Sequence, residues 1–273
     1  MADTALCPHR TRTPPPDVLL APQIWAQLQQ QMRAASPPVW QALYTTPPTA
    51  LLARLVADKL CDQSMSFKAL YAVFLSVLQA TPSVMVCAAQ DLHAYCTQEP
   101  DSADYITPFM YSKGFLAVQA HRLAHILWGN GQHICALHLQ SRISEVTGID
   151  IHPAATLGHK VVLGPGGGIV IGETALVEND VAIMSDVTLG GTGKQTGKRH
   201  PTIGRGTLIG PGTQILGPIE IGEGAKIGAG AVVVKPVRAF SAVAGNPARY
   251  INSHDTWPVL TMDLSFPSID YLI

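Results

Sequence analysis

The amino-acid sequence predicts an α+β protein in which an α-helical domain is followed by a parallel β-helix of hexapeptide repeats. In the second half of the chain an aliphatic residue returns at every sixth position, in three runs: Ile151, Leu157 and Leu163; Ile171, Val177, Ile183 and Leu189; Ile203, Ile209, Ile215, Ile221, Ile227 and Val233. A period of six fits neither a helix nor a lone strand. It fits a prism with three faces per coil, whose coils bury their core by stacking on one another.

The first half of the chain predicts helices. Apolar residues recur at three- and four-residue spacing in segments rich in Ala, Leu and Gln, namely 19–34, 50–62, 66–80, 83–97 and 112–128. The uncharged stretch 69–90 is long enough to span a bilayer, but Pro82 divides it, which favours two core helices and no membrane span. We therefore divide the chain into a disordered tail (1–17), a helical domain (18–147), the β-helix domain (148–250) and a C-terminal tail (251–273).

Composition limits the classes of function. The net charge of −1 gives no electrostatic reason for nucleic-acid binding. Charged residues make up only 14% of the chain, which favours a large buried or oligomeric surface. The five cysteines all precede the β-helix and include no C-x-x-C pair, which indicates reduced thiols in a cytoplasmic setting and no metal site. Arg10, Arg12 and the prolines at 14–16 leave an organellar targeting segment within residues 1–17 as an alternative.

One long interruption of the repeat, residues 190–202 (GGTGKQTGKRHPT), predicts a loop that projects from the prism. Its Gly193-Lys194 pair does not complete a phosphate-binding P-loop, because position 188 is Thr and position 195 is Gln. The glycines and the lysine suit a ligand that bears phosphate or pantetheine, although a solvated loop explains them equally well. Arg199 could hold a carboxylate and His200 could move a proton, or both could be ordinary surface residues.

Two further polar pairs have modest interpretations. Asp150 and His152 lie where the helical domain meets the first coil, so the carboxylate could orient the imidazole, or both could belong to an ordinary turn. His121 and His125 are four residues apart on an expected helix without the Glu of a zinc-protease motif, and we interpret them as ordinary helix histidines.

Long blocks of the sequence resemble serine O-acetyltransferases, the acetyl-CoA-dependent enzymes that begin cysteine biosynthesis. The similar blocks are IHPAATLG (151–158), GIVIGETALVENDVAI (168–183), VTLGGTGKQTGKRHP (187–201), IGEGAKIGAGAVVVK (221–235) and AGNPAR (244–249), with a helical block at 105–128. The resemblance implies a left-handed β-helix and trimers that pair through their helical domains into hexamers. It also implies an acyltransferase in which acetyl-CoA lies between neighbouring β-helices, near Gly191, Gly193, Gly210, Lys226 and Ala229.

The same resemblance assigns the other ligands. The carboxylate of L-serine should meet Arg199, with the catalytic His200 beside its hydroxyl and L-cysteine as a feedback inhibitor in the same site. A second substrate carboxylate from the helical domain corresponds to Glu99. The terminal Ile273 resembles that of plant-type members, in which the terminal carboxylate docks in O-acetylserine sulfhydrylase to form a cysteine synthase complex.

The sequence departs from this family at one important place. The family has an Asp-His pair in the third hexad, and its His is the general base, held by an Asp that corresponds to Asp150. Here the two positions are Gly164 and Pro165, which have no side chain that can accept a proton. Three hypotheses follow: a slow serine O-acetyltransferase with His200 as its remaining base, a catalytically silent partner of the sulfhydrylase, or an acyltransferase for a larger acceptor.

Overall fold

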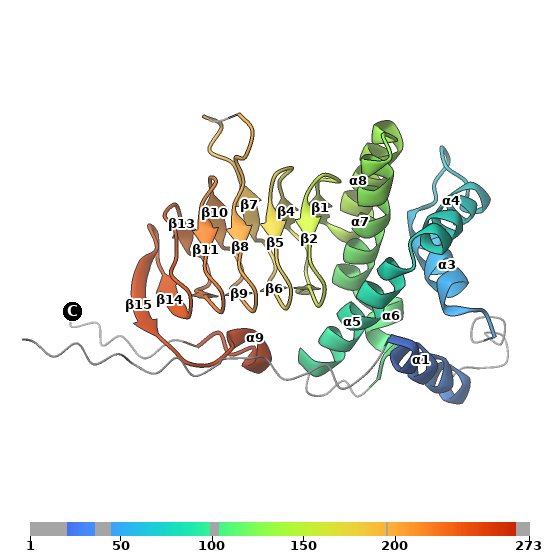
Figure 1. Cartoon of the computed structure of the whole chain (residues 1–273), viewed down its shortest axis with the longest axis horizontal. Helices are drawn as coiled ribbons and strands as arrows, with labels where there is room; N and C mark the ends of the chain where they lie inside the picture. The colour runs from blue at the N-terminus through green and yellow to red at the C-terminus, as the bar shows by residue number, and fades with distance from the viewer. Residues whose placement is uncertain (1–20, 36–44, 99–103, 195, 266–273) are drawn as a thin grey trace, which may run out of the picture.

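The computed structural model describes residues 21–35, 45–98, 104–194 and 196–265, and shows a helical domain at one end of a prism of short strands (Figure 1). The helical domain contains α1 (Ala21–Ala35), α3 (Pro48–Leu60), α4 (Phe67–Ala80), α5 (Ser83–Gln98), α6 (Ile106–Tyr111), α7 (Lys113–Gly129) and α8 (His133–Thr147). Helix α7 is apolar on nearly all sides and lies at the centre of this domain, with α8 packed along it.

Local sequence signals fix several helix ends. The hydroxyls of Ser66 and Ser112 accept hydrogen bonds from the backbone amides of Ala69 and Phe115, which caps α4 and α7. Gly148 ends α8 in the left-handed conformation, with φ of +73°. The predicted break at Pro82 is confirmed. Among the described residues no single helix is long and apolar enough to cross a bilayer, and only α4 with α5 would meet that test as a pair, bent by 100°.

The prism is built from parallel strands of two to four residues, which return to each of three faces once per coil. They are β1 (Ile149–Ile151), β2 (Thr156–Leu157), β3 (Val162–Leu163), β4 (Ile169–Ile171), β5 (Leu176–Val177), β6 (Ala182–Ile183), β7 (Thr188–Gly190), β8 (Thr202–Ile203), β9 (Leu208–Ile209), β10 (Gln214–Leu216), β11 (Glu220–Ile221), β12 (Lys226–Ile227), β13 (Val232–Val233) and β14 (Ser241–Ala244). The three sheets have the orders β1-β4-β7-β10-β13, β2-β5-β8-β11 and β3-β6-β9-β12-β14.

The predicted six-residue period is the inward face of this prism. The strand register stacks each hexad on the hexad that occupies the same face in the next coil, as in the pairs Ile151↔Ile171 and Leu163↔Ile183. Every aliphatic residue of the repeat except the half-buried Leu157 is buried, at 2% exposure or less. Burial of these side chains between coils is the main source of the prism's stability.

Two corners of the prism carry the residues expected in the site. The loop corner comprises residues 152–154, 172–174 and 190–202, and its third coil carries the loop that projects from the prism in Figure 1. The glycine corner comprises residues 164–168, 184–186, 210–212 and 228–230, and is rich in glycines with positive φ. One face of the prism separates the two corners, because β4 and β7 each run from the glycine corner to the loop corner.

A buried ion pair joins the helices to the prism. Asp91 on α5 is fully buried and pairs with Arg122 on α7, with Oδ2 and Nη2 2.7 Å apart. The same guanidinium donates to the carbonyl of Gly158 (2.7 Å), and Asp91 accepts from the amide of Val161 (3.2 Å). Because both charged groups bond prism backbone as well as each other, they fix the first coil against the helical domain.

The C-terminal part of the described chain folds back along the prism. Strand β15 (Arg249–Ser253) pairs antiparallel with β14, and α9 (Pro258–Thr261) lies along the outside of the prism (Figure 1). Trp257 packs on Ala182 and Leu208 and leaves no room for a side chain at Gly206. Lys226, expected near acetyl-CoA, lies 3.9 Å from Asp263 and donates to the carbonyl of Ser265.

Candidate active site

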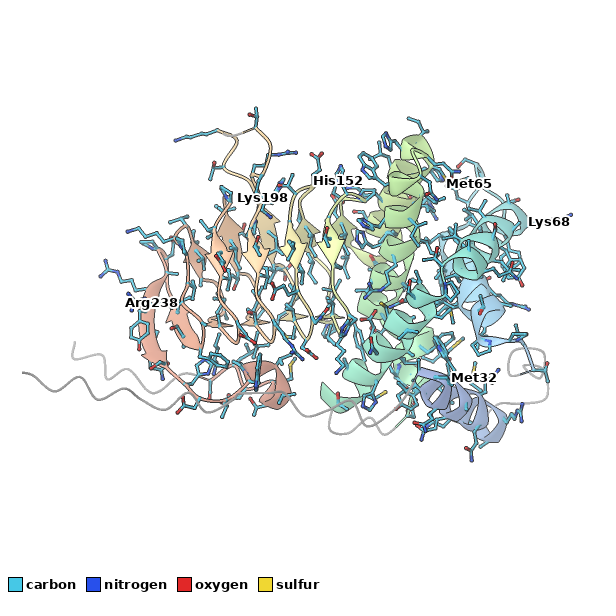
Figure 2. The ribbon with its side chains drawn as sticks, viewed as in Figure 1. Met32, Met65, Lys68, His152, Lys198 and Arg238 are labelled. Carbon is cyan, nitrogen blue, oxygen red and sulfur yellow. The ribbon has the colours of Figure 1, made fainter. Side chains whose placement is uncertain are left out.

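Thr174 holds the Arg199–His200 dipeptide against the loop corner. Its hydroxyl oxygen accepts hydrogen bonds from the amides of Arg199 (3.0 Å) and His200 (3.1 Å). The carbonyl of Thr174 accepts from Nζ of Lys198 (2.7 Å). Figure 2 shows Lys198 and His152 on this same edge of the prism, beside the projecting loop. The arrangement fixes both predicted site residues of the loop to the neighbouring coil.

The hydrogen bonds of His200 define its tautomer. The amide of Thr174 donates to Nδ1 (3.1 Å), and the Thr174 hydroxyl lies 2.9 Å from the same nitrogen. Because a backbone N–H can only donate, Nδ1 is unprotonated and the neutral ring carries its proton on Nε2. The ring lies so close to Gly172 that a Cβ there would be 2.2 Å from Nε2. His200 therefore presents a donor, and this geometry argues against the expectation that it acts as a general base.

Charge around His200 favours the neutral ring. Burial, and next the guanidinium of Arg199, lower the pKa of His200 below its ordinary value, while Glu173 opposes them. Nη2 of Arg199 bonds Oε2 of Glu173, which orients the guanidinium at the surface of the corner. This hydrogen bond is also the main reason that the pKa of Glu173 is lowered. The loop corner thus offers a cation suited to a carboxylate beside a neutral imidazole N–H.

Asp150 and His152 do not form the pair that the sequence allowed. Asp150 accepts a hydrogen bond from Nε2 of Gln140 (2.6 Å), and Nδ1 of His152 accepts from the amide of Ala154 (3.1 Å). The ring of His152 lies edge-on to Trp128, with centroids 5.1 Å apart. Burial lowers the pKa of His152, and Asp150 opposes that shift only through charge. In the part of the chain described, Asp150 holds an amide and no imidazole.

Gly164 and Pro165 lie at the glycine corner, on the wall of a cavity of about 510 Å³ between the prism and the helices. Tyr95, Tyr111 and Met184 contribute to the same wall. The phenol oxygen of Tyr95 bonds the carbonyl of Leu163 (3.0 Å) and its amide (2.9 Å), which fixes the strand just before Gly164. The wall of this cavity combines backbone and apolar side chains with the polar side chains of Tyr95, Tyr111 and Lys113, and positions 164 and 165 contribute no group that can accept a proton.

The residues expected to bind acetyl-CoA are divided between the two corners. Gly191 and Gly193 belong to the loop corner, and Gly210 and Ala229 to the glycine corner. A Cβ on Gly210 would be 2.6 Å from the amide nitrogen of Ala229, so these coils approach one another closely only because residue 210 is glycine. His200 and Gly164 are divided in the same way. One chain therefore presents two half-sites on different edges.

The remaining predicted residues are Glu99, Ile273 and the histidine pair of α7. Glu99 and Ile273 lie outside the described residues. Within the described ranges, no group of three His, Cys, Asp or Glu side chains is placed to hold a metal ion. His121 is buried in α7, where its ring packs beside that of His125, with centroids 5.7 Å apart.

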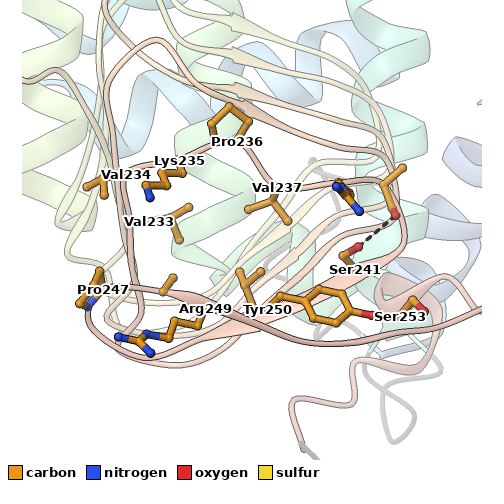
Figure 3. Close-up of a pocket in the computed structure, with 14 residues that line it drawn as sticks. Val233, Val234, Lys235, Pro236, Val237, Ser241, Pro247, Arg249, Tyr250 and Ser253 are labelled. Carbon is orange, nitrogen blue, oxygen red and sulfur yellow. Dashed lines mark hydrogen bonds between the residues drawn. The ribbon is translucent and has the colours of Figure 1, made fainter.

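A larger cavity, of about 840 Å³, lies at the end of the prism that is remote from the helices (Figure 3). Lys235, Arg238 and Arg249 contribute to its wall, together with Tyr250 and several valines and prolines. Its walls belong to the last coil and to β15, whereas Arg199 and His200 belong to the third coil. This cavity takes no part in the site described above.

Sequence reasoning missed Glu173 and Thr174, which position the two loop residues. Both follow Gly172 at a turn of the repeat, and the tripeptide Gly-Glu-Thr looks like an ordinary polar corner. The sequence signal for a positioning role was that Glu173 and Thr174 lie at a corner one coil before the inserted loop. The signal becomes specific only when the coils are stacked, since the contacts join residues 26 positions apart.

Comparison with known proteins places most of the chain in one family. A family model for the N-terminal part of serine acetyltransferases matches residues 24–120, and one for bacterial transferase hexapeptide repeats matches residues 200–235. The serine acetyltransferase of Escherichia coli K12 is 45% identical over 221 residues, covering 81% of each chain. The chloroplastic serine acetyltransferase 1 of Arabidopsis thaliana is 49% identical over 218 residues, covering 78% of this chain and 69% of the relative.

Solved structures extend the similarity to three dimensions. A serine acetyltransferase in complex with cysteine superposes with a TM-score of 0.87 at 37% identity, covering 91% of this chain and all (100%) of the other. A serine acetyltransferase in complex with CoA gives a TM-score of 0.80 at 38% identity, covering 85% of this chain and 100% of the other. With its helical domain, its prism and its projecting Arg-His loop, the chain belongs to the serine acetyltransferase family.

Proposed function

We propose that the protein transfers the acetyl group of acetyl-CoA to the hydroxyl of L-serine, giving O-acetylserine. The observation that carries this proposal is the Thr174 clamp, which presents the Arg199 guanidinium and the His200 Nε2–H together at the loop corner. The names of the relatives, a solved soybean serine acetyltransferase in complex with serine and a solved serine acetyltransferase in complex with CoA support the two substrates.

In this mechanism Arg199 binds the serine carboxylate with the donors that Glu173 leaves free. The serine oxygen attacks the thioester carbon, the carbon–oxygen bond forms as the carbon–sulfur bond breaks, and the hydroxyl proton ends on the departing CoA sulfur. The Nε2–H of His200 donates to the oxygen on which negative charge develops. Because position 165 holds no base, we expect turnover slower than positioned proton transfer would give, by a factor on the order of 100 or more.

A complete site requires more than one copy of the chain. We infer a homotrimer, or a hexamer of two trimers joined through the helical domains, in which the loop corner of one copy faces the glycine corner of the next. Acetyl-CoA would then contact Gly191 and Gly193 of one copy and Gly210, Lys226 and Ala229 of its neighbour. The contacts of Lys226 with Asp263 and Ser265 predict that these two residues compete with the ligand for this lysine.

A thiol-release assay with acetyl-CoA and L-serine at high enzyme concentration tests the proposal. We expect serine-dependent CoA release that His200→Ala abolishes. Because His200 acts as a donor, His200→Gln should keep part of the rate, since the amide can donate but cannot take up a proton. Activity equally absent in both variants would instead support a base. No CoA release from folded wild-type oligomer would favour the silent-partner hypothesis. That hypothesis is motivated by Gly164 and Pro165, which stand where the family has its Asp-His pair.

We further propose that the C-terminal Ile273 binds O-acetylserine sulfhydrylase and that L-cysteine inhibits by occupying the serine site. The first rests on the terminal sequence and the second on the solved relative in complex with cysteine. Deleting Ile273 should remove sulfhydrylase binding in a titration while leaving the oligomer unchanged in sedimentation. Unaltered binding would contradict the proposed role of the tail.

The cysteine pattern and the N-terminal sequence support a proposal for the cellular location. We propose a cytoplasmic enzyme, although some relatives are named as chloroplastic or mitochondrial. A fluorescent protein fused after residue 17 should remain in the cytoplasm, and import of the fusion into an organelle would overturn this.

A further inference from the structure

The glycine corner holds a carboxylate that the family resemblance does not assign. We propose that Asp186 binds the ammonium group of L-serine, and of the inhibitor L-cysteine, in place of the Asp that is absent at position 164. This inference rests on the proposed function, because it concerns the same amino-acid site. It makes Asp186 a substrate-binding residue and involves no covalent step.

The strand register places Asp186 in the second coil, next to residues 164–168 of the first coil. Leu163 pairs with Ile183 before the corner, and Val170 pairs with Thr188 after it. Asp186 therefore stacks on Gly168, and its amide donates to the carbonyl of Gly167 (2.9 Å). The carboxylate belongs to the same edge of the prism as Gly164 and Pro165, where the family has the Asp that helps to hold serine.

The carboxylate of Asp186 lies against the glycines that follow Gly164 and Pro165. Gly166, Gly167 and Gly168 have φ values of +102°, +82° and +69°, a conformation that favours glycine. A Cβ added at Gly168 would lie 2.0 Å from Oδ1 of Asp186, so the carboxylate occupies space that any other residue at 168 would fill. Because residues 166–168 are glycines, the Asp186 carboxylate of the second coil can lie against the backbone of the first coil at this corner.

Backbone geometry alone does not explain an aspartate here. Asp186 has φ of +59°, which Asp tolerates, but Gly212 and Gly230 meet the same requirement at this corner in the next coils. At Asp180, which also has φ of +59°, the carboxylate bonds Arg205 (2.8 Å). Asp186 is exposed, and among the described residues no Lys or Arg is found within ion-pair distance of it. Its charge is therefore available for an external cation.

The two half-sites together match a zwitterion. Arg199 of a neighbouring copy would hold the carboxylate of the amino acid, and Asp186 would hold its ammonium group. A charge-assisted hydrogen bond of this kind is stronger than a neutral one. Recognition of both ends restores the amine binding that the family obtains from its Asp in the third hexad.

Calorimetric binding of L-cysteine and of CoA to the intact oligomer tests this inference. Asp186→Asn removes the charge. Asp186→Gly introduces the residue that the next two coils already have at this corner position, at Gly212 and Gly230. We expect both variants to bind cysteine about tenfold more weakly, a change of about 1.4 kcal/mol. CoA should bind them no less tightly, because it carries no ammonium partner for Asp186. Glu223→Gln, an exposed carboxylate at another corner, is the matched control and should bind both ligands normally.

Steady-state kinetics provide the second readout. In the Asp186 variants the KM for L-serine should rise about tenfold while the KM for acetyl-CoA and kcat change little. Unchanged cysteine binding in Asp186→Gly, or equal weakening of cysteine and CoA, would overturn the inference. If wild-type protein shows no turnover but cysteine binding still depends on Asp186, the proposed catalytic function fails and this inference stands. If both variants turn over with a normal KM for L-serine, the proposed catalytic function stands and the role of Asp186 is wrong.

Discussion

Thr174 controls the geometry of both loop residues through a single hydroxyl. We expect Thr174→Val to lower kcat/KM by ~10- to 100-fold, because it removes two hydrogen bonds to the Arg199–His200 backbone and one to the ring, each contributing ~0.5 to 1 kcal/mol. Valine has almost the same shape, so packing should survive. Thr174→Ser, which keeps the hydroxyl, is the control and should keep most of the activity. Full activity in the valine variant would show that the clamp is dispensable.

Position 165 decides how fast the chemistry proceeds. Pro165→His should raise kcat by ~100-fold, because it restores a side chain that can accept the serine proton. Adding Gly164→Asp is harder, since its Cβ would lie 3.1 Å from Cα and 3.3 Å from Cε of Met184. Pro165→Gln is the matched control, because it adds an amide of similar size without a base. An equal rate in the His and Gln variants would contradict a base-limited reaction.

At the scale of elements, the repeat was predictable and the contacts between coils were not. The six-residue period identifies the buried side chains from Ile151 to Val233, because each coil places the same hexad position inward. The projecting loop follows from one interruption of that period. The Thr174 clamp joins residues that are distant in sequence, so its geometry appears only when the coils stack. Segments after Arg238 have no period, and the packing of Trp257 on Ala182 and Leu208 had no local signal.

Helix α7 contains a titratable group that links stability to pH. Burial, and next the charge of His125, lower the pKa of His121 to about 3. The unfolded chain takes up this proton near pH 6.5, whereas the native state does so only near pH 3. Because the unfolded state binds more protons in this window, the native state loses stability as the pH falls through it.

We therefore expect His121→Phe to flatten the dependence of the free energy of unfolding on pH between about 6.5 and 3. Phenylalanine fills a similar buried volume and does not titrate. Urea unfolding at several pH values measures the slope. His133→Phe, on the exposed surface of α8, is the matched control. An identical slope in wild type and His121→Phe would show that other groups dominate acid unfolding.

At the scale of the whole molecule, the division of the site follows from the shape of a prism. Residues of one corner come from successive coils and stack into a line, while a different corner lies across a full face. Arg199 and His200 therefore cannot share an edge with Gly164, Asp186 or Ala229 of the same chain. The sequence supplied most of these residues but could not assign them to edges, because that requires the number of residues in each coil and the direction of each turn.

Complementation between two variants tests whether neighbouring copies complete the site. His200→Ala damages the loop corner, and Ala229→Trp should block the exposed glycine corner without disturbing the buried core. Each variant alone should be inactive. In mixed oligomers some sites combine the intact loop corner of one variant with the intact glycine corner of the other, so random assembly of equal amounts should recover about a quarter of the wild-type rate. Mixing His200→Ala with Thr174→Val places both changes on one corner and should give no such recovery. Differently tagged chains verify that the oligomers are mixed, and mixed oligomers of the first pair without activity would mean that one chain contains the whole site.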